Sequence, residues 1–196
     1  MIYLNGEKSK NYAAINNSLD RNNITLIGSA VPTHFGSLRN SFSFQGFEFS
    51  ANLSFRLGYY FRRNSLDNGA IYSTNGYQYA VDYDSRWQKA GDENITHVPA
   101  LVYPNISQRS NVYRYADILI EKADNIKLQD IRLAWSPTNR KSLTGFISDF
   151  QLYTYFTNLG YLWKANKYNI DPDAQATGLS NIPNPFTFSF GIKVKL

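Results

Sequence analysis

Apolar and polar residues alternate along several stretches of this chain, and the alternation predicts long β-strands. In the clearest stretch, residues 47–62, every odd-numbered position is apolar and nearly every even-numbered position is polar or glycine. A period of two puts the odd positions on one face of a strand, whereas a helix would scatter them around its axis. Soluble strands average about 5–6 residues, so a strand of this length is more typical of a membrane barrel, whose strands need about 9–11.

The same alternation runs through residues 36–45, immediately before that stretch. Gly46 lies between the two and offers a tight turn. Residues 36–63 are therefore predicted to form a β-hairpin.

Three more strands are predicted in residues 124–196. Residues 125–135 change phase near Gln129, which indicates either a bulge or a strand start there. Residues 150–163 are strand-like in composition, but competing apolar positions leave their register open. The last strand, residues 186–196, alternates phenylalanines and aliphatic residues with small residues and lysines.

The remaining stretches are predicted to be loops. Residues 1–35 are polar and turn-rich and are assigned as an external loop and strand lead-in. Residues 64–123 form a long external loop, and residues 164–184 a second one between the last strands. So long a loop counts against a compact soluble domain, but membrane barrels carry long loops on their external side.

Composition narrows the class of protein. Aromatic residues make up 16% of the 196 residues while the mean hydropathy is -0.41, and no window approaches the ~18–20 apolar residues of a spanning helix. A barrel wall escapes that criterion because only alternate residues touch lipid. The net charge is +5, but the basic residues are scattered, so no nucleic-acid partner is predicted.

These observations predict an all-β fold, an antiparallel meander of about five long strands. Five strands cannot close a barrel, because bacterial barrels start at about eight. The N-terminus also lacks the basic and apolar segments of a signal peptide. We therefore expect further strands and an export signal upstream of residue 1. The alternatives are a soluble β-sandwich carbohydrate-binding module and another outer-membrane barrel such as a porin.

The motifs along the chain resemble those of SusC/RagA-type TonB-dependent transporters, in the order that this family has them. Residues 28–47 resemble its G-x-x-x-P-x-x-x-G-x-x-N-x-F-x-Y-x-G-F hairpin, and residues 126–135 its L-R-L-K-N-I-x-L-G-Y strand. Residues 153–159 resemble a Y-x-x-x-x-N-L strand, 169–173 a G-Y-D-P-E loop and 182–191 the P-x-P-R-x-F-x-F-G closing strand.

The resemblance implies a 22-stranded transmembrane barrel with a filled lumen, of which this chain supplies the C-terminal strands. It implies a Gram-negative outer membrane with its lipid, a SusD-like surface lipoprotein, and a TonB complex that acts through an N-terminal part missing here. The substrates of such transporters are glycans, oligosaccharides or peptides. A fragment of this kind is not expected to transport alone.

Candidate site residues follow from parity and from the loops. The polar side of the strands would face the lumen; its charged and amide residues are Arg39, Glu48, Asn52, Arg56, Arg62, Lys193 and Lys195. Trp87 and Trp163 lie in or beside external loops and are candidates for stacking on a sugar ring. The alternative for both is packing within a loop or in the interfacial aromatic girdle.

The sequence contains no recognisable catalytic or metal-binding motif. Cysteine is absent, and His34 and His97 have no neighbouring ligand residue in sequence. Asp171 and Asp173 are too few for a calcium loop. No nucleophile elbow or phosphate loop is present. We therefore predict no enzymatic activity, no cofactor and no metal.

Overall fold

The computed structural model describes residues 3–4, 7–18, 24–72, 82–138, 147–173 and 184–195. It divides into two compact units. The sheet unit comprises Gly28–Phe61 and Lys122–Leu196, and the helical unit comprises Met1–Ile27 and Arg62–Glu121. None of the helices in the described ranges is long and apolar enough to cross a membrane.

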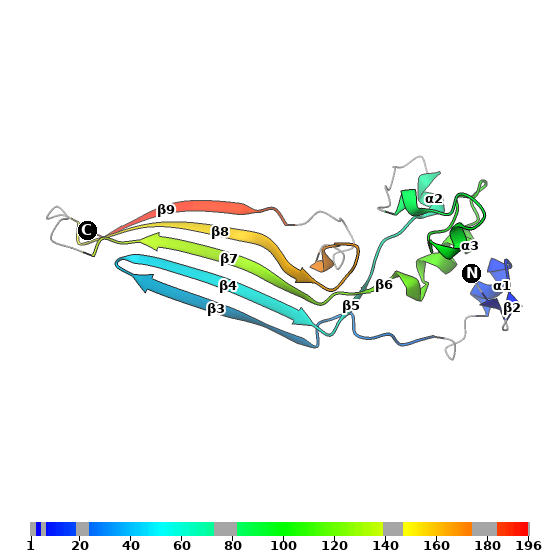
Figure 1. The fold of residues 1–196 in the computed structure, drawn as a ribbon, viewed down its shortest axis with the longest axis horizontal. Helices are drawn as coiled ribbons and strands as arrows, with labels where there is room; N and C mark the ends of the chain where they lie inside the picture. Colours follow the sequence, from blue (N-terminus) through cyan, green and yellow to red (C-terminus); the bar gives the residue numbers. More distant parts are fainter. Residues whose placement is uncertain are drawn as a thin grey trace. The chain divides into compact units, whose positions relative to one another are not determined.

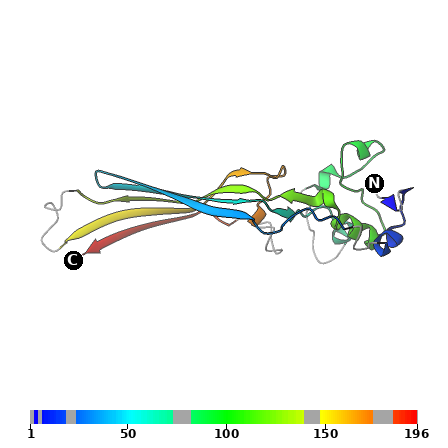
Figure 2. The same cartoon turned by 90° about the horizontal axis from the view of Figure 1, so that it is seen from below.

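The sheet unit is one antiparallel sheet of five strands (Figure 1). In spatial order, which is also chain order, the strands are β3 (His34–Phe44), β4 (Phe47–Leu57), β7 (Asn125–Trp135), β8 (Asp149–Lys164) and β9 (Thr187–Lys195). The strands twist along their length (Figure 2), as the chirality of L-residues favours. The predicted antiparallel meander of about five long strands is confirmed.

A two-residue turn joins β3 to β4. Gln45 and Gly46 both have positive φ, 46° and 85°, which is the conformation of the type I′ turns that suit twisted hairpins. A Cβ on Gly46 would lie 2.1 Å from the carbonyl oxygen of Ser136, so only glycine fits. The turn fixes the register in which Phe44 faces Phe47.

The predicted irregularity near Gln129 is a bulge in β7. Asn52 of β4 pairs with Asp130, but the next residue, Leu53, pairs with Leu128, so Gln129 has no opposite partner. The bulge restores the phase, and the apolar residues on either side of it fall on the same face of the sheet.

The register that the sequence leaves open, that of β8, is set by a second irregularity. Asn158 and Gly160 have positive φ, 57° and 108°. Because Asp130 pairs with Thr157 and Leu128 with Gly160, the even-numbered residues of β8 keep the apolar face across this point; the parity changes at the next register shift, where Lys127 pairs with Tyr161 but Ile126 with Trp163. Before it the even-numbered residues share the apolar face, and after it Trp163 faces Ile126.

The strand that begins at Phe47 is shorter than the alternation predicts. It ends at Leu57 because Gly58 turns the chain with φ 76°, and a Cβ there would lie 2.0 Å from Thr33 Oγ1. After this break, β5 (Tyr60–Arg62) pairs with β6 (Ile120–Lys122) in a separate two-stranded sheet. The prediction of one strand from 47 to 62 is wrong at its C-terminal end.

The chain leaves and re-enters the sheet through a hydrogen-bonded junction. Asp124 Oδ1 accepts from the backbone N–H groups of Gly58 (2.7 Å) and Tyr59 (3.3 Å). The N–H of Ala123 donates to the Tyr59 carbonyl at 3.0 Å. Asn125 Nδ2 donates to the Tyr59 hydroxyl at 2.8 Å. The residues just before and just after the intervening segment are thereby held together.

The helical unit is built largely from residues that the sequence predicts as loop. In its described residues this unit contains two short strands, three short α-helices and three single-turn 3₁₀ helices. They are β1 (Tyr3–Leu4), β2 (Glu7–Lys8), α1 (Tyr12–Asn17), α2 (Asn68–Ile71), Tyr83–Ser85, Asp92–Asn94, α3 (Ser107–Arg114) and Asp117–Leu119. The assignment of residues 64–123 to the external side stays a prediction.

Buried polar contacts hold the helical unit together. Arg63, which is 5% exposed, pairs with Asp82 at 2.8 Å, and the Leu66 N–H donates to the other carboxylate oxygen of Asp82 at 3.1 Å. Asp92 Oδ2 accepts from the N–H groups of Gln88 (2.9 Å) and Lys89 (3.0 Å). These two donors, Gln88 first, lower the pKa of the Asp92 carboxyl because they favour its charged form.

Candidate functional site

One face of the sheet is apolar and exposed across all five strands. The register lines its side chains up in rows that cross the whole sheet. One row contains Phe42, Phe49, Leu133, Thr154 and Phe190, and the next contains Phe44, Phe47, Trp135, Leu152 and Ile192. Phe44 is 73% exposed and Phe190 63%. So large a continuous apolar surface exceeds what a soluble monomer normally leaves in water.

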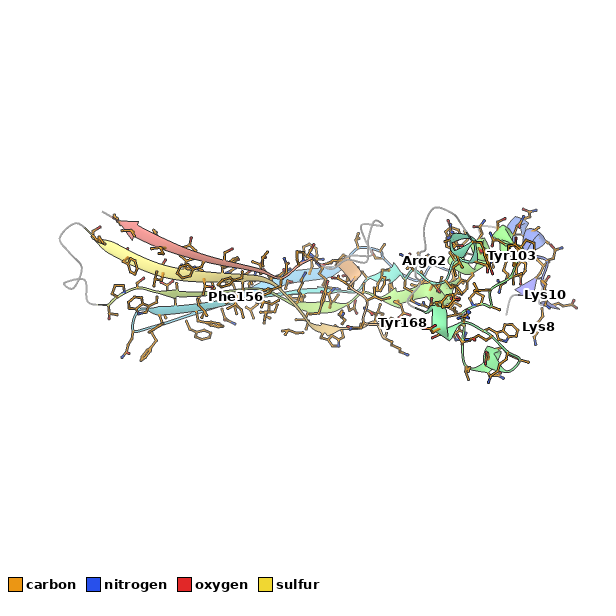
Figure 3. All side chains as sticks on the ribbon, turned by 90° about the horizontal axis from the view of Figure 1, so that it is seen from above. Lys8, Lys10, Arg62, Tyr103, Phe156 and Tyr168 are labelled. Atoms are coloured by element: carbon orange, nitrogen blue, oxygen red, sulfur yellow. The ribbon has the colours of Figure 1, made fainter. Side chains whose placement is uncertain are left out.

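Aromatic rings pack against one another within this face. The Phe42 and Phe49 rings are stacked with centroids 6.4 Å apart, and the Phe47 and Trp135 rings lie 6.3 Å apart. Between β8 and β9, the ring centroids of Phe156, which is labelled in Figure 3, and Phe188 lie 5.2 Å apart. These pairs join neighbouring strands and leave the outer surfaces of the rings uncovered.

The opposite face carries a row of polar side chains through all five strands. The row contains Arg39, Asn52, Asp130, Thr157 and Thr187. Asp130 is 6% exposed, and its carboxylate receives Arg39 Nη2 at 3.0 Å and Asn52 Nδ2 at 2.9 Å. Because a buried carboxylate needs charged or hydrogen-bonding partners, this cluster fixes three strands to one another.

Arg132 is the centre of a second polar cluster on this face. Its Nη1 lies 3.0 Å from Glu48 Oε2, and its Nη2 lies 3.1 Å from Gln151 Oε1. The guanidinium also lies 5.7 Å from the centroid of the Tyr153 ring. Tyr153 in turn covers Gly191, where a Cβ would approach the ring to 2.3 Å. Four adjacent strands are linked by these contacts.

A third cluster joins the end of the sheet to the segment after β8. Arg56 forms an ion pair with Asp173, and Lys127 Nζ lies 3.9 Å from the same carboxylate. The Tyr161 hydroxyl donates to Asp171 at 2.6 Å. Lys127 is only 7% exposed, so the aspartate balances a nearly buried cation.

The predicted polar-face residues within the sheet share one side. Pairing places Arg39 opposite Asn52, and Glu48 and Arg56 have the same parity on β4. Lys193 pairs with Gln151 and Lys195 with Asp149, which put both lysines on that side as well. That this side lines a lumen stays a prediction.

Arg62 does not lie on this polar side of the sheet. It lies after the Gly58 break, in the helical unit (labelled in Figure 3), and its Nη1 donates to the carbonyls of Arg114 (3.0 Å) and Ala116 (2.9 Å). The prediction that it shares the polar face is therefore wrong, because the alternation does not reveal the break in the strand.

The two candidate stacking residues lie in different surroundings. Trp163 pairs with Ile126 on the apolar face and is 46% exposed. That placement favours the interfacial girdle for this residue. Trp87 lies in the helical unit, is 41% exposed, and borders a hollow of about 570 Å³. Stacking of either residue on a sugar ring stays a prediction.

The hollow brings together residues that the sequence does not connect. It is lined by Lys10, Asn11, Tyr12, Ala13, Trp87, Ala100, Val102, Ile106, Gln108 and Arg109. Only Trp87 is among the candidates from the sequence. Lys10 and Arg109 lie about a hundred positions apart with no shared motif, so no sequence signal points to them together.

Among the described residues, no group of three or more His, Cys, Asp or Glu side chains lies close enough together to hold a metal ion. Asp171 and Asp173 are instead engaged with Tyr161, Arg56 and Lys127. Asp173 balances the charge of the two cations at the end of the sheet, and Asp171 accepts hydrogen bonds from the Tyr161 hydroxyl and the Asp173 N–H.

Comparisons with known proteins find one curated relative and several solved structures that this chain resembles. No family model matches it. The chain is 28% identical over 156 residues to the TonB-dependent receptor P39 of Formosa agariphila, an alignment that covers 76% of this chain and 14% of that receptor.

Solved structures of the RagAB peptide importer share the fold. The open-open state matches 87% of this chain with a TM-score of 0.59, and another RagAB structure matches 86% with 0.58, both at 19% identity. In each case this chain spans 18% of the matched chain. The curated relative confirms the predicted resemblance to TonB-dependent receptors, and the solved structures confirm that the predicted all-β fold resembles part of such a barrel protein.

Proposed function

We propose that this chain forms part of the barrel wall of a TonB-dependent transporter of the SusC/RagA type in the outer membrane of a Gram-negative bacterium. The transporter imports glycans, oligosaccharides or peptides, and the chain itself catalyses no reaction. Both the curated relative and the matched structures are receptors or importers, which supports this assignment.

The observation that carries the proposal is the inverted polarity of the sheet. Phe42, Phe44 and Phe190 are each more than 60% exposed, whereas Asp130 and Lys127 on the other face are less than 10% exposed. A soluble sheet buries its apolar face, so this arrangement is stable in water only if another layer covers the apolar side. Lipid supplies that cover without any further protein.

The length of the strands fits the thickness of a bilayer. β3 and β4 each have 11 residues, which at about 3.4 Å per residue gives roughly 37 Å. A strand tilted by about 45° then spans about 26 Å, close to the ~25 Å apolar band of outer-membrane barrels.

The partners follow from the same assignment. A SusD-like surface lipoprotein would cap the external mouth, and the matched RagAB structures are of a two-part importer. Energy would come from the TonB complex through a region of the transporter outside this chain. Arg39, Glu48, Asn52, Arg56, Lys193 and Lys195 would line the lumen and set its electrostatic potential.

Single-cysteine labelling tests the orientation of the sheet, because the chain has no native cysteine. Ser189→Cys and Phe190→Cys are adjacent on β9 but lie on opposite faces. In outer-membrane vesicles that contain the full-length transporter, a fluorophore on the Phe190→Cys variant should be quenched by brominated lipid, whereas one on the Ser189→Cys variant should not. Equal quenching of the two labels would refute the proposal.

Fractionation separates the alternatives. A β-sandwich binding module would be recovered in the soluble fraction without detergent. A porin would take up its substrate in cells that lack TonB, whereas the proposed transporter would not.

A further inference from the structure

The hollow in the helical unit is formed by three segments that are distant in sequence. Lys10 lies just before α1 and Tyr12 begins it, Trp87 comes from the stretch after the 3₁₀ turn Tyr83–Ser85, and Gln108 and Arg109 come from α3. A hydrogen bond from Asn16 Nδ2 to the Gln108 carbonyl, at 3.2 Å, holds α1 against α3. The hollow is thus a built feature of one compact unit.

The hollow has a positive charge that the described residues do not neutralise. Lys10 and Arg109 line it, and neither forms an ion pair with any residue in the described ranges. No carboxylate is among the described residues that line the hollow. By contrast, Arg63 and Arg114 in the same unit are paired with aspartates. Two uncompensated cations at one concave site favour an anionic ligand.

The rest of the lining offers flat apolar surface with a few polar groups. Trp87 is 41% exposed, and its indole N–H already donates to the Lys89 carbonyl, so the ring has only its apolar surface to offer a ligand. Tyr12 and Ile106 extend the apolar surface, and the Gln108 side chain adds an amide. Aromatic surface with a small number of polar groups is the usual lining of a small-ligand site.

We propose that this hollow is a subsite for an acidic oligosaccharide, whose sugar rings lie against Trp87 and whose carboxylates face Lys10 and Arg109. A sugar ring presents C–H groups on its face and hydroxyls at its edge, which suits an aromatic platform beside an amide. The proposal rests on the proposed function, since it names the substrate class of that transporter.

A peptide fits these observations less well. A common way to hold an extended peptide is through main-chain hydrogen bonds to the free edge of a strand. None of the lining residues lies in a strand; they come from α1, α3 and irregular segments. An acidic peptide is therefore an outcome that the test must exclude.

Calorimetric titration of the full-length transporter in detergent tests the proposal. The probe is trigalacturonate, compared with neutral maltotriose and with triglutamate. The variants are Lys10→Gln, Arg109→Gln, their combination and Trp87→Leu, with Lys8→Gln as the matched control. Lys8 is exposed, does not line the hollow, and is labelled beside Lys10 in Figure 3.

Trigalacturonate should bind more tightly than either comparison ligand. Each cation variant should weaken its binding about fivefold, equivalent to about 1 kcal/mol, and the double variant more than either. Trp87→Leu should also weaken it, and Lys8→Gln should leave it unchanged. Unaltered heat-modifiable mobility on electrophoresis establishes that each variant is folded.

Three results would overturn the proposal: no binding of trigalacturonate, equal affinity for maltotriose or triglutamate, or unchanged affinity in the double variant. If any of these occurs while the protein still fractionates with the outer membrane and needs TonB for uptake, only the subsite is refuted. If the protein is soluble or TonB-independent, the proposed function fails instead.

Discussion

Replacing Leu38 with arginine introduces a charge into the middle of the exposed apolar face. Leu38 is 57% exposed and lies one position from the midpoint of β3. If this face contacts lipid, the residue lies within a few ångströms of the bilayer midplane, given a tilt of about 45°. The neighbouring Ser37 has the opposite parity and is exposed on the polar face, opposite Ser54.

We expect the same new side chain to reduce the free energy of unfolding by very different amounts at the two positions. An arginine on the lipid face near the midplane destabilises a barrel by about 2–4 kcal/mol. That range corresponds to a factor of about 30 to 800 in the folding equilibrium. Ser37→Arg puts the same charge among polar groups, where surface substitutions usually change stability by less than about 0.5 kcal/mol.

Urea unfolding in phospholipid vesicles, followed by heat-modifiable mobility, measures the difference. The full-length transporter with Leu38→Arg should unfold at a clearly lower urea concentration than the natural protein, and Ser37→Arg close to it. If Ser37→Arg costs as much as Leu38→Arg, or more, the assignment of the apolar face to lipid is refuted.

Three further predictions concern other parts of the molecule. Asp130→Asn removes the charge that Arg39 binds and should cost about 1–2 kcal/mol in urea unfolding; Arg39→Gln should then cost less in that background than alone, and strict additivity would contradict the pairing. Gly191→Ala should lower the unfolding midpoint, because the new methyl group displaces the Tyr153 ring; an unchanged midpoint would mean that the ring moves freely. The lowered pKa of Asp92 stabilises the helical unit above the unfolded-state pKa of about 3.9, and this contribution is lost as the pH falls through the lower folded-state value. Pepsin cleavage between about pH 5 and pH 2 should show that loss in the natural protein, and Asp92→Asn should abolish this pH-dependent contribution.

Most of the strands were predictable from the alternation of apolar and polar residues, although the alternation that continues to residue 62 did not reveal that β4 ends at Leu57. β7 has the predicted bounds, and its bulge at Gln129 lies where the phase changes, because a period of two makes any extra residue visible. The register of β8 was not predictable in this way. Asn158 and Gly160 interrupt the strand because both have a positive φ. The order of apolar and polar residues does not show where such a backbone irregularity lies.

The candidate site was only partly predictable. The polar face followed from parity, apart from Arg62, which lies beyond a glycine that turns the chain. The hollow had no periodic signal, because its two cations belong to separate segments that meet only in the folded unit. The alternation of neighbouring residues predicts local backbone geometry, whereas the hollow depends on contacts between segments that are distant in sequence.

The junction at Tyr59 and Asp124 has an evolutionary consequence. The chain leaves the sheet at Gly58 and returns at Asn125, and the hydrogen bonds of Asp124 and Ala123 to this exit hold the two ends together whatever the intervening segment does. Since the cost of closing a loop grows only slowly with its length, segments of different size and chemistry are interchangeable between these two points. Recombination or laboratory grafting at this junction would replace the segment between Gly58 and Asn125 while the registers of β4 and β7 stay as they are.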